Sequence, residues 1–260
     1  MTVDTSSNPR PREAIVLVAG VGSRLQPLTH ERPKCLFEVG GMPLLKRLLF
    51  QLQHVGIKRV VLATGHLHDQ LMTSVRRWEL ELDIDACQND TYATENNAVS
   101  LGVAMEGLES RRFLLCDGDI LLRRVQMLEQ VVKSPHENVL AMMRFDALTE
   151  EDMKVTVDTD GRVVELGKAM PTEQADGESL GFQKIGPSAF LPLAERIDGL
   201  SPREREELYY EDVFAELVDR DIEFHACSLP PGGWTEIDTP AELEGAREMA
   251  ARWGHDTVLA

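Results

Sequence analysis

The sequence predicts an α/β protein, a three-layer sandwich in which helices cover both faces of a mostly parallel mixed sheet. Apolar, β-branched runs alternate with segments of helical periodicity up to about residue 132, which is the pattern of consecutive βαβ units. After about residue 140 the runs become short and strand-like, which indicates a small antiparallel portion. A length of 260 residues fits one large domain of this kind.

The first half of the chain is expected to hold four strands and four helices. Residues 14–19 (AIVLVA) are continuously apolar, as in a strand buried on both faces of a parallel sheet. Pro43 opens a segment whose leucines recur at helical spacing, and Gly56 stands where a C-terminal cap belongs. The same criteria predict further strands at 58–64, 82–88 and 112–117, and further helices at 66–78, 97–105 and 125–132.

The second half is expected to add antiparallel strands and three helices. The run Thr159-Asp160-Gly161, between two strand-like segments, is typical of a hairpin turn. The predicted strands are 138–145, 154–158, 162–168 and 222–229, and the predicted helices are 188–196, 211–220 and 241–253. Residues 1–12 are polar and contain two prolines, so they are expected to form a flexible tail before a single domain at 13–260.

Composition excludes several classes of function. Forty-four acidic residues against 27 basic ones give a formal net charge of -17, which would repel nucleic acids and anionic membranes. No apolar run approaches the roughly 20 residues that span a membrane, and the N-terminus lacks the apolar core of a signal peptide. We therefore expect a cytoplasmic protein that binds no nucleic acid and does not insert into a membrane, with free thiols at its four scattered cysteines.

A glycine-containing loop, residues 19–36 (AGVGSRLQPLTHERPKCL), follows the first predicted strand. Gly20 and Gly22 would leave backbone N–H groups open to a phosphate, although a plain tight turn uses glycine equally well. Arg24 and Lys34 favour the phosphate-binding interpretation, because a loop that only turns gains nothing from two flanking cations.

Two groups of carboxylates stand at predicted strand ends. Asp117 and Asp119 flank one glycine at the end of a buried strand (LLCDGDI), at the edge where α/β proteins usually bind ligands. Glu236 and Asp238 alternate about Ile237, so both would face the same side of a short strand. Such oxygen ligands suit Mg²⁺. The simpler alternatives are a polar strand exit in the first group and a solvated loop in the second.

The loop resembles the signature of the nucleotidyltransferases that join a nucleoside triphosphate to a sugar phosphate or alcohol phosphate and release pyrophosphate. That signature has the form GxGxRLxPLTxxxPK, and every fixed position is filled between Gly20 and Lys34. The resemblance extends in order across most of the chain. It implies a Rossmann-like sandwich with a nucleotide-binding part at about 13–140 and an acceptor-binding part at about 141–240.

Within this superfamily, several stretches are similar to the cytidylyltransferases that act on phosphocholine and related small phosphates or phosphonates. These stretches are YATENNAVSL (92–101), CDGDI (116–120), KVTVD with GRVVELGK (154–168), GESLGFQKIG (177–186), YYED (209–212) and GWTEIDTPAEL (233–243). The similarity implies that CTP and a small phosphate or phosphonate monoester give a CDP-linked product and pyrophosphate. The acceptor oxygen would attack the α-phosphorus in line and, being already an anion, would need no general base.

The resemblance also implies roles for the charged residues. Lys34 would stabilise charge on the α-phosphate, and Arg24 would bind the β- and γ-phosphates as they leave. Mg²⁺ would bridge the α-phosphate and the acceptor, and Asp117 would orient the groups around it. The residues implied to ligate Mg²⁺ are Asp119, Glu236 and Asp238.

The nucleotide site is expected to combine the glycine loop with the start of the helix predicted at 97–105. Its candidate residues are Ala19, Gly20, Gly22, Ser23, Asn96, Asn97, Ser100 and Asp117. Asn96 and Asn97 could equally serve only to cap that helix. An amide or a backbone carbonyl could distinguish cytosine from uracil, since cytosine carries an exocyclic donor where uracil carries an acceptor.

The acceptor site is expected to combine a lysine with aromatic and acidic residues. Lys168, at the end of the second hairpin strand, is the candidate for the acceptor phosphate, and the alternative is a solvated surface lysine. Aromatic and acidic side chains together could enclose an ammonium group, although the aromatic ones could also be ordinary core residues. The members of this predicted box are Tyr209, Tyr210, Glu211, Asp212 and Trp234.

Two other functions fit parts of the same sequence. One is a sugar-1-phosphate or inositol-phosphate nucleotidyltransferase that uses CTP, UTP or dTTP. The other is a catalytically silent relative that binds nucleotide and regulates a partner, which the presence of Lys34, Asp119 and Asp238 disfavours. A dinucleotide-dependent dehydrogenase fits poorly, because GVGSRL lacks the third glycine at the required offset. The oligomeric state stays open, with a homodimer as one alternative.

Overall fold

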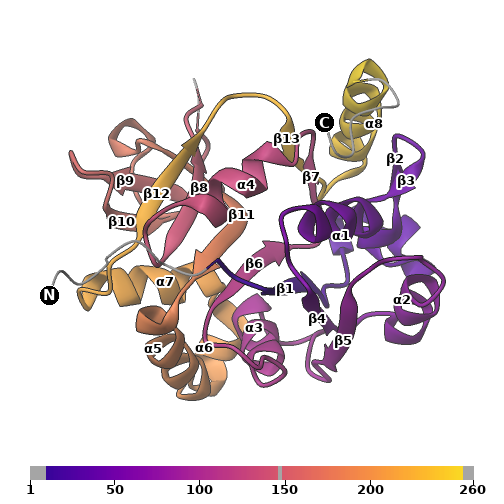
Figure 1. Ribbon diagram of the computed structural model, residues 1–260, viewed down its shortest axis with the longest axis horizontal. Coiled ribbons are helices and arrows are strands. Elements are labelled where there is room, and N and C mark those ends of the chain that lie inside the picture. Colours follow the sequence, from indigo (N-terminus) through magenta and orange to yellow (C-terminus); the bar gives the residue numbers. More distant parts are fainter. Residues whose placement is uncertain (1–9, 146–147, 254–260) are drawn as a thin grey trace, which may run out of the picture.

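The computed structural model describes residues 10–145 and 148–253, and a mixed sheet runs through the middle of them (Figure 1). Hydrogen bonds connect its strands in the order β10-β9-β11-β6-β1-β4-β5, with β8 paired to β11 and β12 paired to β8. The strands of this sheet are β1 (Glu13–Val18), β4 (Arg59–Thr64), β5 (Asp83–Gln88), β6 (Phe113–Asp117), β8 (Val139–Met143), β9 (Lys154–Val157), β10 (Val163–Gly167), β11 (Gly177–Ile185) and β12 (His225–Leu229).

The strands β6, β1, β4 and β5 are parallel and in register, so Leu17 lies beside Ala63 on one side and Asp117 on the other. The side chains of β1, β4 and β6 are almost entirely apolar and buried, because helices cover both faces of this part of the sheet. Since parallel strands end at one edge of a sheet, the loops after β1, β5 and β6 gather at that carboxyl edge. The parallel half predicted from the sequence is confirmed.

The strand β11 joins the parallel strands to the rest of the sheet in the antiparallel sense. It pairs with β8 on one side and, at its first and last residues, with β9 and β6 on the other, and β9 and β10 form a hairpin. The antiparallel portion predicted after residue 140 is therefore confirmed. The sequence pattern did not indicate β11 itself, because Gly181 interrupts the run and its polar residues Gln183 and Lys184 are buried.

Helices cover both faces of the sheet (Figure 1). α1, α2 and α4 bury their apolar sides against one face, and α3, α5 and α7 bury theirs against the other. The helices are α1 (Leu44–His54), α2 (His68–Val75), α3 (Asn97–Met105), α4 (Gln126–Lys133), α5 (Pro187–Asp198), α6 (Pro202–Glu207), α7 (Tyr210–Asp219) and α8 (Pro240–Trp253). Each predicted helix forms, with bounds shifted by up to three residues. The sequence did not predict α6, because its run PREREE has no apolar side to bury.

A third apolar cluster ties the C-terminal helix α8 to the loop that follows β1. Leu25 and Phe37 of that loop pack in one cluster with Ile237 and Leu243, which flank the start of α8. Burial of these side chains holds the loop against the last part of the chain.

Two short two-stranded sheets complete the architecture. They pair β2 (Glu38–Val39) with β3 (Met42–Pro43), and β7 (Ile120–Leu122) with β13 (Trp234–Glu236). In the second of them Glu236 lies opposite Ile120, which directly follows Asp119 in the sequence. This pairing brings the carboxylates before α8 to the end of β6.

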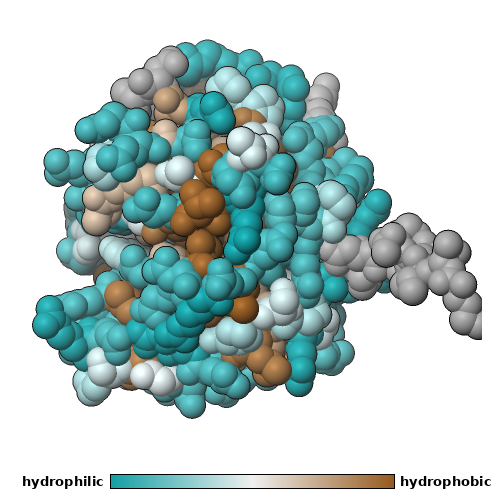
Figure 2. Space-filling view, turned by 90° about the vertical axis from the view of Figure 1, so that its left-hand side faces the viewer, coloured by the Kyte–Doolittle hydropathy of each residue, from teal (hydrophilic) through white to brown (hydrophobic). Residues whose placement is uncertain are grey.

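The described surface is mainly hydrophilic. On the side that carries β9 and β10, hydrophilic side chains surround a small hydrophobic patch (Figure 2), as expected for a chain with 27% charged residues. No helix within the two described ranges is both long and apolar enough to cross a bilayer.

The described chain joins the sheet just before β1. The carbonyl of Arg12 accepts hydrogen bonds from the amides of Lys58 and Arg59, beside the first residues of β4. Residues 1–9 of the predicted N-terminal tail lie outside the described residues.

Candidate functional site

A cleft of about 730 Å³ opens at the carboxyl edge of the parallel strands. One side comes from the loop after β1, the end of β6 and the residues around β13. The other side comes from residues 149–153, from β11 and from the start of α7. The glycine loop and both carboxylate groups singled out in the sequence therefore face one space.

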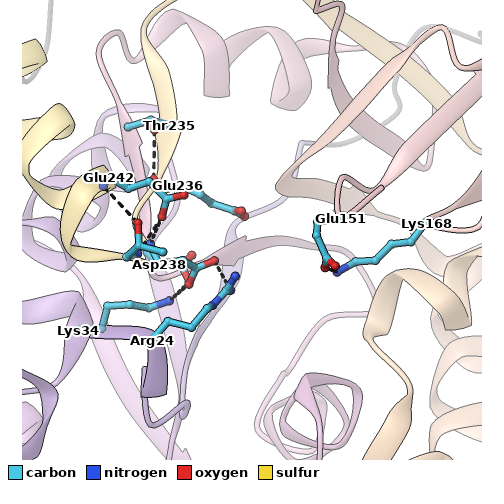
Figure 3. A network of polar contacts seen from close by, with 10 residues as sticks. Arg24, Lys34, Glu151, Lys168, Thr235, Glu236, Asp238 and Glu242 are labelled. Atoms are coloured by element: carbon cyan, nitrogen blue, oxygen red, sulfur yellow. Dashed lines mark hydrogen bonds and ion pairs between the residues drawn. The ribbon is translucent and has the colours of Figure 1, made fainter. Parts of the chain in front are cut away.

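Lys34 lies between two carboxylates that are remote from it in the sequence (Figure 3). Its Nζ donates to Asp119 Oδ2 at 2.5 Å and to Asp238 Oδ1 at 2.7 Å. Arg24 Nη2 donates to the other oxygen of Asp238 at 2.6 Å. The loop after β1, the end of β6 and the segment before α8 thus meet at one point.

Charge pairing keeps Lys34 protonated despite its burial. Its side chain is 16% exposed, and burial alone would lower its pKa. The carboxylates of Asp119 and Asp238 outweigh that effect and hold the pKa of Lys34 well above its ordinary value. A fixed, partly buried ammonium group attracts an anion more strongly than one in water. Lys34 is therefore suited to bind a phosphate oxygen.

The loop after β1 consists of short 3-10 turns at Ser23–Leu25, Leu28–His30 and Lys34–Leu36. Gly22 enters the first turn with a φ of +63°, a conformation that favours glycine, and the Thr29 hydroxyl donates to its carbonyl. Ala19, Gly20 and Gly22 line the cleft. Ser23 is exposed and is not among the described residues that line it.

Gly118 separates the two aspartates at the end of β6 because a side chain does not fit there. Its amide donates to the carbonyl of Leu17 on β1, and a Cβ on Gly118 would lie 2.8 Å from that same carbonyl oxygen. The close approach of the two backbones sets the positions from which Asp117 and Asp119 reach the cleft.

Gly118→Ala is expected to lower the free energy of unfolding by about 1–3 kcal/mol, because the added methyl group overpacks a backbone contact. Denaturant-induced unfolding measures this change. Gly245→Ala on α8 is the matched control, since nothing lies within 4 Å of a Cβ there, and it should raise stability by about 0.5–1 kcal/mol. Wild-type stability of Gly118→Ala would show that the backbone relaxes around the methyl group.

Further carboxylates surround Lys34, and together they fit a divalent cation. Burial and the neighbouring carboxylates raise the pKa of Asp117 and of Glu236 well above the ordinary value. Within the described residues, Asp119 Oδ1 and Glu211 Oε2 are buried and have no hydrogen-bond partner. Hard divalent ions such as Mg²⁺ and Ca²⁺ bind oxygen donors of this kind, and a cation here would compensate their mutual repulsion.

A buried tyrosine holds Asp117. The hydroxyl of Tyr210 donates to Asp117 Oδ2 at 2.9 Å, and the Tyr210 ring packs edge-on against Phe214 in the core. Gly181, with a φ of +69°, leaves room for the same carboxylate, because a Cβ there would lie 2.6 Å from Asp117 Oδ2. These contacts suit the orienting role that the resemblance implies for Asp117.

The two asparagines at the start of α3 face the cleft, and one of them also caps the helix. Asn96 and Asn97 line the cleft, and the side-chain oxygen of Asn96 also caps α3 by accepting from the amide of Asn97. Asn97 Oδ1 accepts from the amide of Tyr210 at 2.9 Å. Ser100 lines the cleft too, and its hydroxyl accepts from Asn89 Nδ2.

The far end of the cleft is acidic. Figure 3 shows Lys168 and Glu151 on the side opposite Lys34, with their charged groups 3.9 Å apart. Lys168 Nζ also lies 4.6 Å from the centre of the Tyr209 ring, which is 39% exposed. Asp152 and Glu178 line the same end, and burial together with the charge of Asp152 raises the pKa of Glu178 to about 7.

Sequence reasoning missed the carboxylates at this end. Glu151 and Asp152 stand in a polar run before a predicted strand, which is typical of a solvated loop. Glu178 is the second residue of β11, the strand that the apolar pattern did not indicate. The one available signal was the stretch GESLGFQKIG, which contributed to the resemblance without pointing to a particular residue.

Three members of the predicted aromatic and acidic box are not among the described residues that line the cleft, namely Tyr210, Asp212 and Trp234. Tyr210 is fully buried, and the Asp212 carboxylate accepts from the amide of Tyr209 as a cap on α7. Trp234 donates through Nε1 to a main-chain carbonyl of β11 at 3.0 Å. These contacts direct the three side chains toward other parts of the protein. Tyr209 and Glu211 are the members of the box that line the cleft.

Comparisons with known proteins find similar chains. The family model described as MobA-like NTP transferase domain matches residues 14–162. The chain is 26% identical over 252 residues to a 2-aminoethylphosphonate cytidylyltransferase of Lancefieldella rimae, covering 94% of this chain and 93% of that protein. It is 35% identical over 134 residues to a CMP-5'-(3-aminopropyl)phosphonate synthase of Streptomyces rubellomurinus, covering 52% of this chain and 21% of that protein. A solved structure described as the inositol-1-phosphate CTP transferase from T. maritima superimposes with a TM-score of 0.80 and 25% identity, over 96% of this chain and 98% of that one.

Proposed function

The chain belongs to the MobA-like NTP transferase family, and from this premise we propose that it transfers CMP from CTP to a small phosphate or phosphonate monoester that carries an amine. The acceptor oxygen attacks the α-phosphorus, the bond from that phosphorus to the bridging oxygen breaks, and pyrophosphate leaves. The observation that carries the proposal is the convergence of Lys34, Asp119 and Asp238 in one cleft.

Positioning and charge neutralisation supply the catalysis in this proposal, because the acceptor is already an anion and needs no general base. Lys34 binds the α-phosphate oxygen on which negative charge grows, and Arg24 binds the departing pyrophosphate. In the structure both cations pair with Asp238. Binding of the triphosphate therefore gives each cation a phosphate partner next to the carboxylate that holds it in place.

Asp119, Glu236 and Asp238 are the proposed ligands of Mg²⁺. All their donor atoms are carboxylate oxygens, and the buried Oδ1 of Asp119 lacks a donor among the described residues, which fits a hard ion. When bound, the ion supplies the positive charge that brings two anionic substrates together. Asp117 is not a ligand in this proposal, because Tyr210 already holds its carboxylate.

The acidic end of the cleft favours an acceptor with an ammonium group. Glu151, Asp152 and Glu178 offer carboxylates to such a group, while Lys168 offers a cation to the phosphate or phosphonate. The Tyr209 ring already contacts the ammonium of Lys168, so it presents an aromatic face of the kind that binds ammonium groups. The relatives named for aminoethylphosphonate and aminopropylphosphonate support the same class of acceptor.

An inositol phosphate or sugar 1-phosphate is the second candidate acceptor. The similar structure from T. maritima is described as an inositol-1-phosphate CTP transferase, which favours this alternative. An uncharged polyol, however, gives the carboxylates of Asp152 and Glu178 no opposite charge to bind, so we rank the amine-bearing acceptor first.

Pyrophosphate release with Mg²⁺ tests the proposal. Each of CTP, UTP, dTTP, ATP and GTP is combined with phosphocholine, phosphoethanolamine, 2-aminoethylphosphonate, inositol phosphate and glucose 1-phosphate. We expect release with CTP and an amine-bearing acceptor. Release with inositol phosphate alone would contradict the acceptor class, and preference for UTP or dTTP would contradict the nucleotide. No release with any pair would favour the catalytically silent alternative.

Glu178→Gln is expected to raise the KM for the amine-bearing acceptor by between about tenfold and about 100-fold, since a hydrogen bond to a charged group contributes about 1.5–3 kcal/mol. Glu165→Gln, on an exposed position of β10, is the matched control and should leave the KM unchanged.

The pH dependence of this KM gives a second test of Glu178. Its pKa of about 7 means that the carboxyl group is largely protonated at pH 6 and ionised at pH 8, so the wild-type KM should fall as the pH rises. Asp152 adds to this shift and the Lys154 charge opposes it. Ionisation of the acceptor itself affects wild type and Glu178→Gln alike. A fall of the same size in the variant would exclude Glu178 as its source.

A further inference from the structure

The helix α6 is tied to the segment before α3, although 110 residues separate Glu95 from Arg205. The guanidinium of Arg205 donates to both oxygens of Glu95, from Nε at 2.6 Å and from Nη2 at 3.1 Å. The amide of Asn96 donates to the carbonyl of Arg205 at 2.7 Å, and Asn96 Nδ2 donates to the carbonyl of Glu207 at 3.1 Å. One short helix thus holds two consecutive residues through both side chain and main chain.

Glu95 and Asn96, the two residues held in this way, line the cleft, and Arg205 contacts them from outside the described lining. The side chain of Glu95 is 14% exposed. Hydrogen bonds from Arg205 lower the pKa of Glu95 against the effect of burial, and the Thr91 hydroxyl, which also donates to it, contributes to the lowering. Glu95 therefore stays ionised at neutral pH, as a fixed hydrogen-bond acceptor in the cleft wall.

The helix α6 is anchored well enough to act as a support. Ser201 and Glu204 form a capping box at its start. Arg196 of α5 pairs with Glu204 at 2.5 Å and with Glu216 of α7 at 2.5 Å. These ion pairs join α5, α6 and α7, so α6, which carries Arg205, is held against two other helices.

We propose that Arg205 is a positioning residue for the nucleotide: it fixes Glu95 and Asn96 in the orientation in which they meet the nucleoside triphosphate. The inference rests on the proposed function and on the nucleotide site that the sequence predicts between the glycine loop and the start of α3. The planar fork of an arginine matches both oxygens of a carboxylate, and a lysine cannot reproduce that geometry. Arg205 acts through its two partners and is not among the described residues that line the cleft.

Calorimetric titration with CTP and steady-state kinetics, both on the full chain, test this role. Arg205→Ala is expected to raise the Kd and the KM for CTP by between about tenfold and about 100-fold, with kcat at saturating CTP within about threefold of wild type. The acceptor KM should change less, because the capping box of Tyr209 and Asp212 holds the start of α7 independently. Arg205→Lys keeps the charge and should recover part of the CTP affinity.

Arg203→Ala is the matched control on the same helix. Arg203 is 83% exposed and pairs with Glu207 one turn away, so its removal should leave CTP binding unchanged. Thermal unfolding of both variants separates positioning from folding. We expect Arg205→Ala to unfold as cooperatively as Arg203→Ala.

A double-mutant cycle with Glu95→Gln completes the test. If Arg205 acts through Glu95, the double variant binds CTP no more weakly than the weaker of the two single variants. Additive effects, or wild-type CTP affinity in Arg205→Ala, would overturn the inference. If the wild-type protein uses another triphosphate instead of CTP, the proposed function is contradicted. The role of Arg205 is then tested by the same titrations with that triphosphate.

Discussion

Lys34→Met is expected to lower kcat by about 100-fold or more, because it removes the ammonium group that stabilises charge developing on the α-phosphate. Loss of one preorganised contact of this kind removes about 2.7–4 kcal/mol of transition-state stabilisation. Methionine keeps much of the length and apolar bulk of lysine, so the side-chain packing beside Gly22 is largely retained. Initial rates with saturating CTP and acceptor measure the effect.

The folded state should survive this substitution. Asp119 and Asp238, which lose their common partner, are each 22% exposed at the cleft and can be hydrated there. Lys133→Met is the matched control, because it breaks an exposed lysine–glutamate pair on α4 and should keep full activity. A kcat of Lys34→Met within about threefold of wild type would exclude a direct role in charge stabilisation.

Asp119→Asn is expected to lower kcat by about 100-fold or more and to raise the Mg²⁺ concentration that gives half-maximal activity. The substitution keeps the shape of the side chain, but it removes one negative charge and replaces one candidate metal-ligating oxygen by nitrogen. Lys34 retains its second partner, since Nζ also donates to Asp238. Activity across a Mg²⁺ titration measures the requirement, and binding of Mn²⁺ alone, followed by electron paramagnetic resonance, measures the site directly.

Asp85→Asn is the control matched in charge. Asp85 lies on β5, away from the cleft, and its carboxylate pairs with Arg59 of β4 at 2.5 Å. The variant should therefore keep the wild-type Mg²⁺ requirement. If Asp119→Asn also keeps it, and binds Mn²⁺ as wild type does, Asp119 is not a metal ligand.

The parts of the site that depend on local backbone were predictable. Gly22 adopts a positive φ at the entry to a tight turn, and glycine is the residue that such a turn favours. Asp117 and Asp119 follow an apolar run that could only be a buried strand, and parallel strands end together at one edge. The helix at 97–105 was predicted with its observed bounds, because Asn96 caps it and a regular apolar segment follows.

The orientation of the aromatic and acidic box was not predictable in the same way. Tyr209 and Tyr210 are neighbours, yet the first is partly exposed at the cleft and the second is buried against Asp117. Which of them turns inward depends on how α7 packs against the sheet. Trp234 is turned away from the cleft because β13 pairs with β7 and its indole meets β11, and both partners are distant in the sequence.

Local sequence was enough to place most strands and helices in order, although not β11 or α6, and to single out a glycine-containing loop and two groups of carboxylates at strand ends. Apolar periodicity and glycine positions reflect forces between near neighbours, so a single chain displays them directly. Local pattern alone does not join Lys34 to Asp119 and Asp238, which lie 85 and 204 residues away. The resemblance implied that they share one site, and the tertiary structure supplies the contacts between them. Contacts between distant segments also decided that Arg205 pairs with Glu95 in the cleft wall and that Glu178 faces the cleft. Such contacts form between elements that are far apart in the sequence, so no local pattern predicts them.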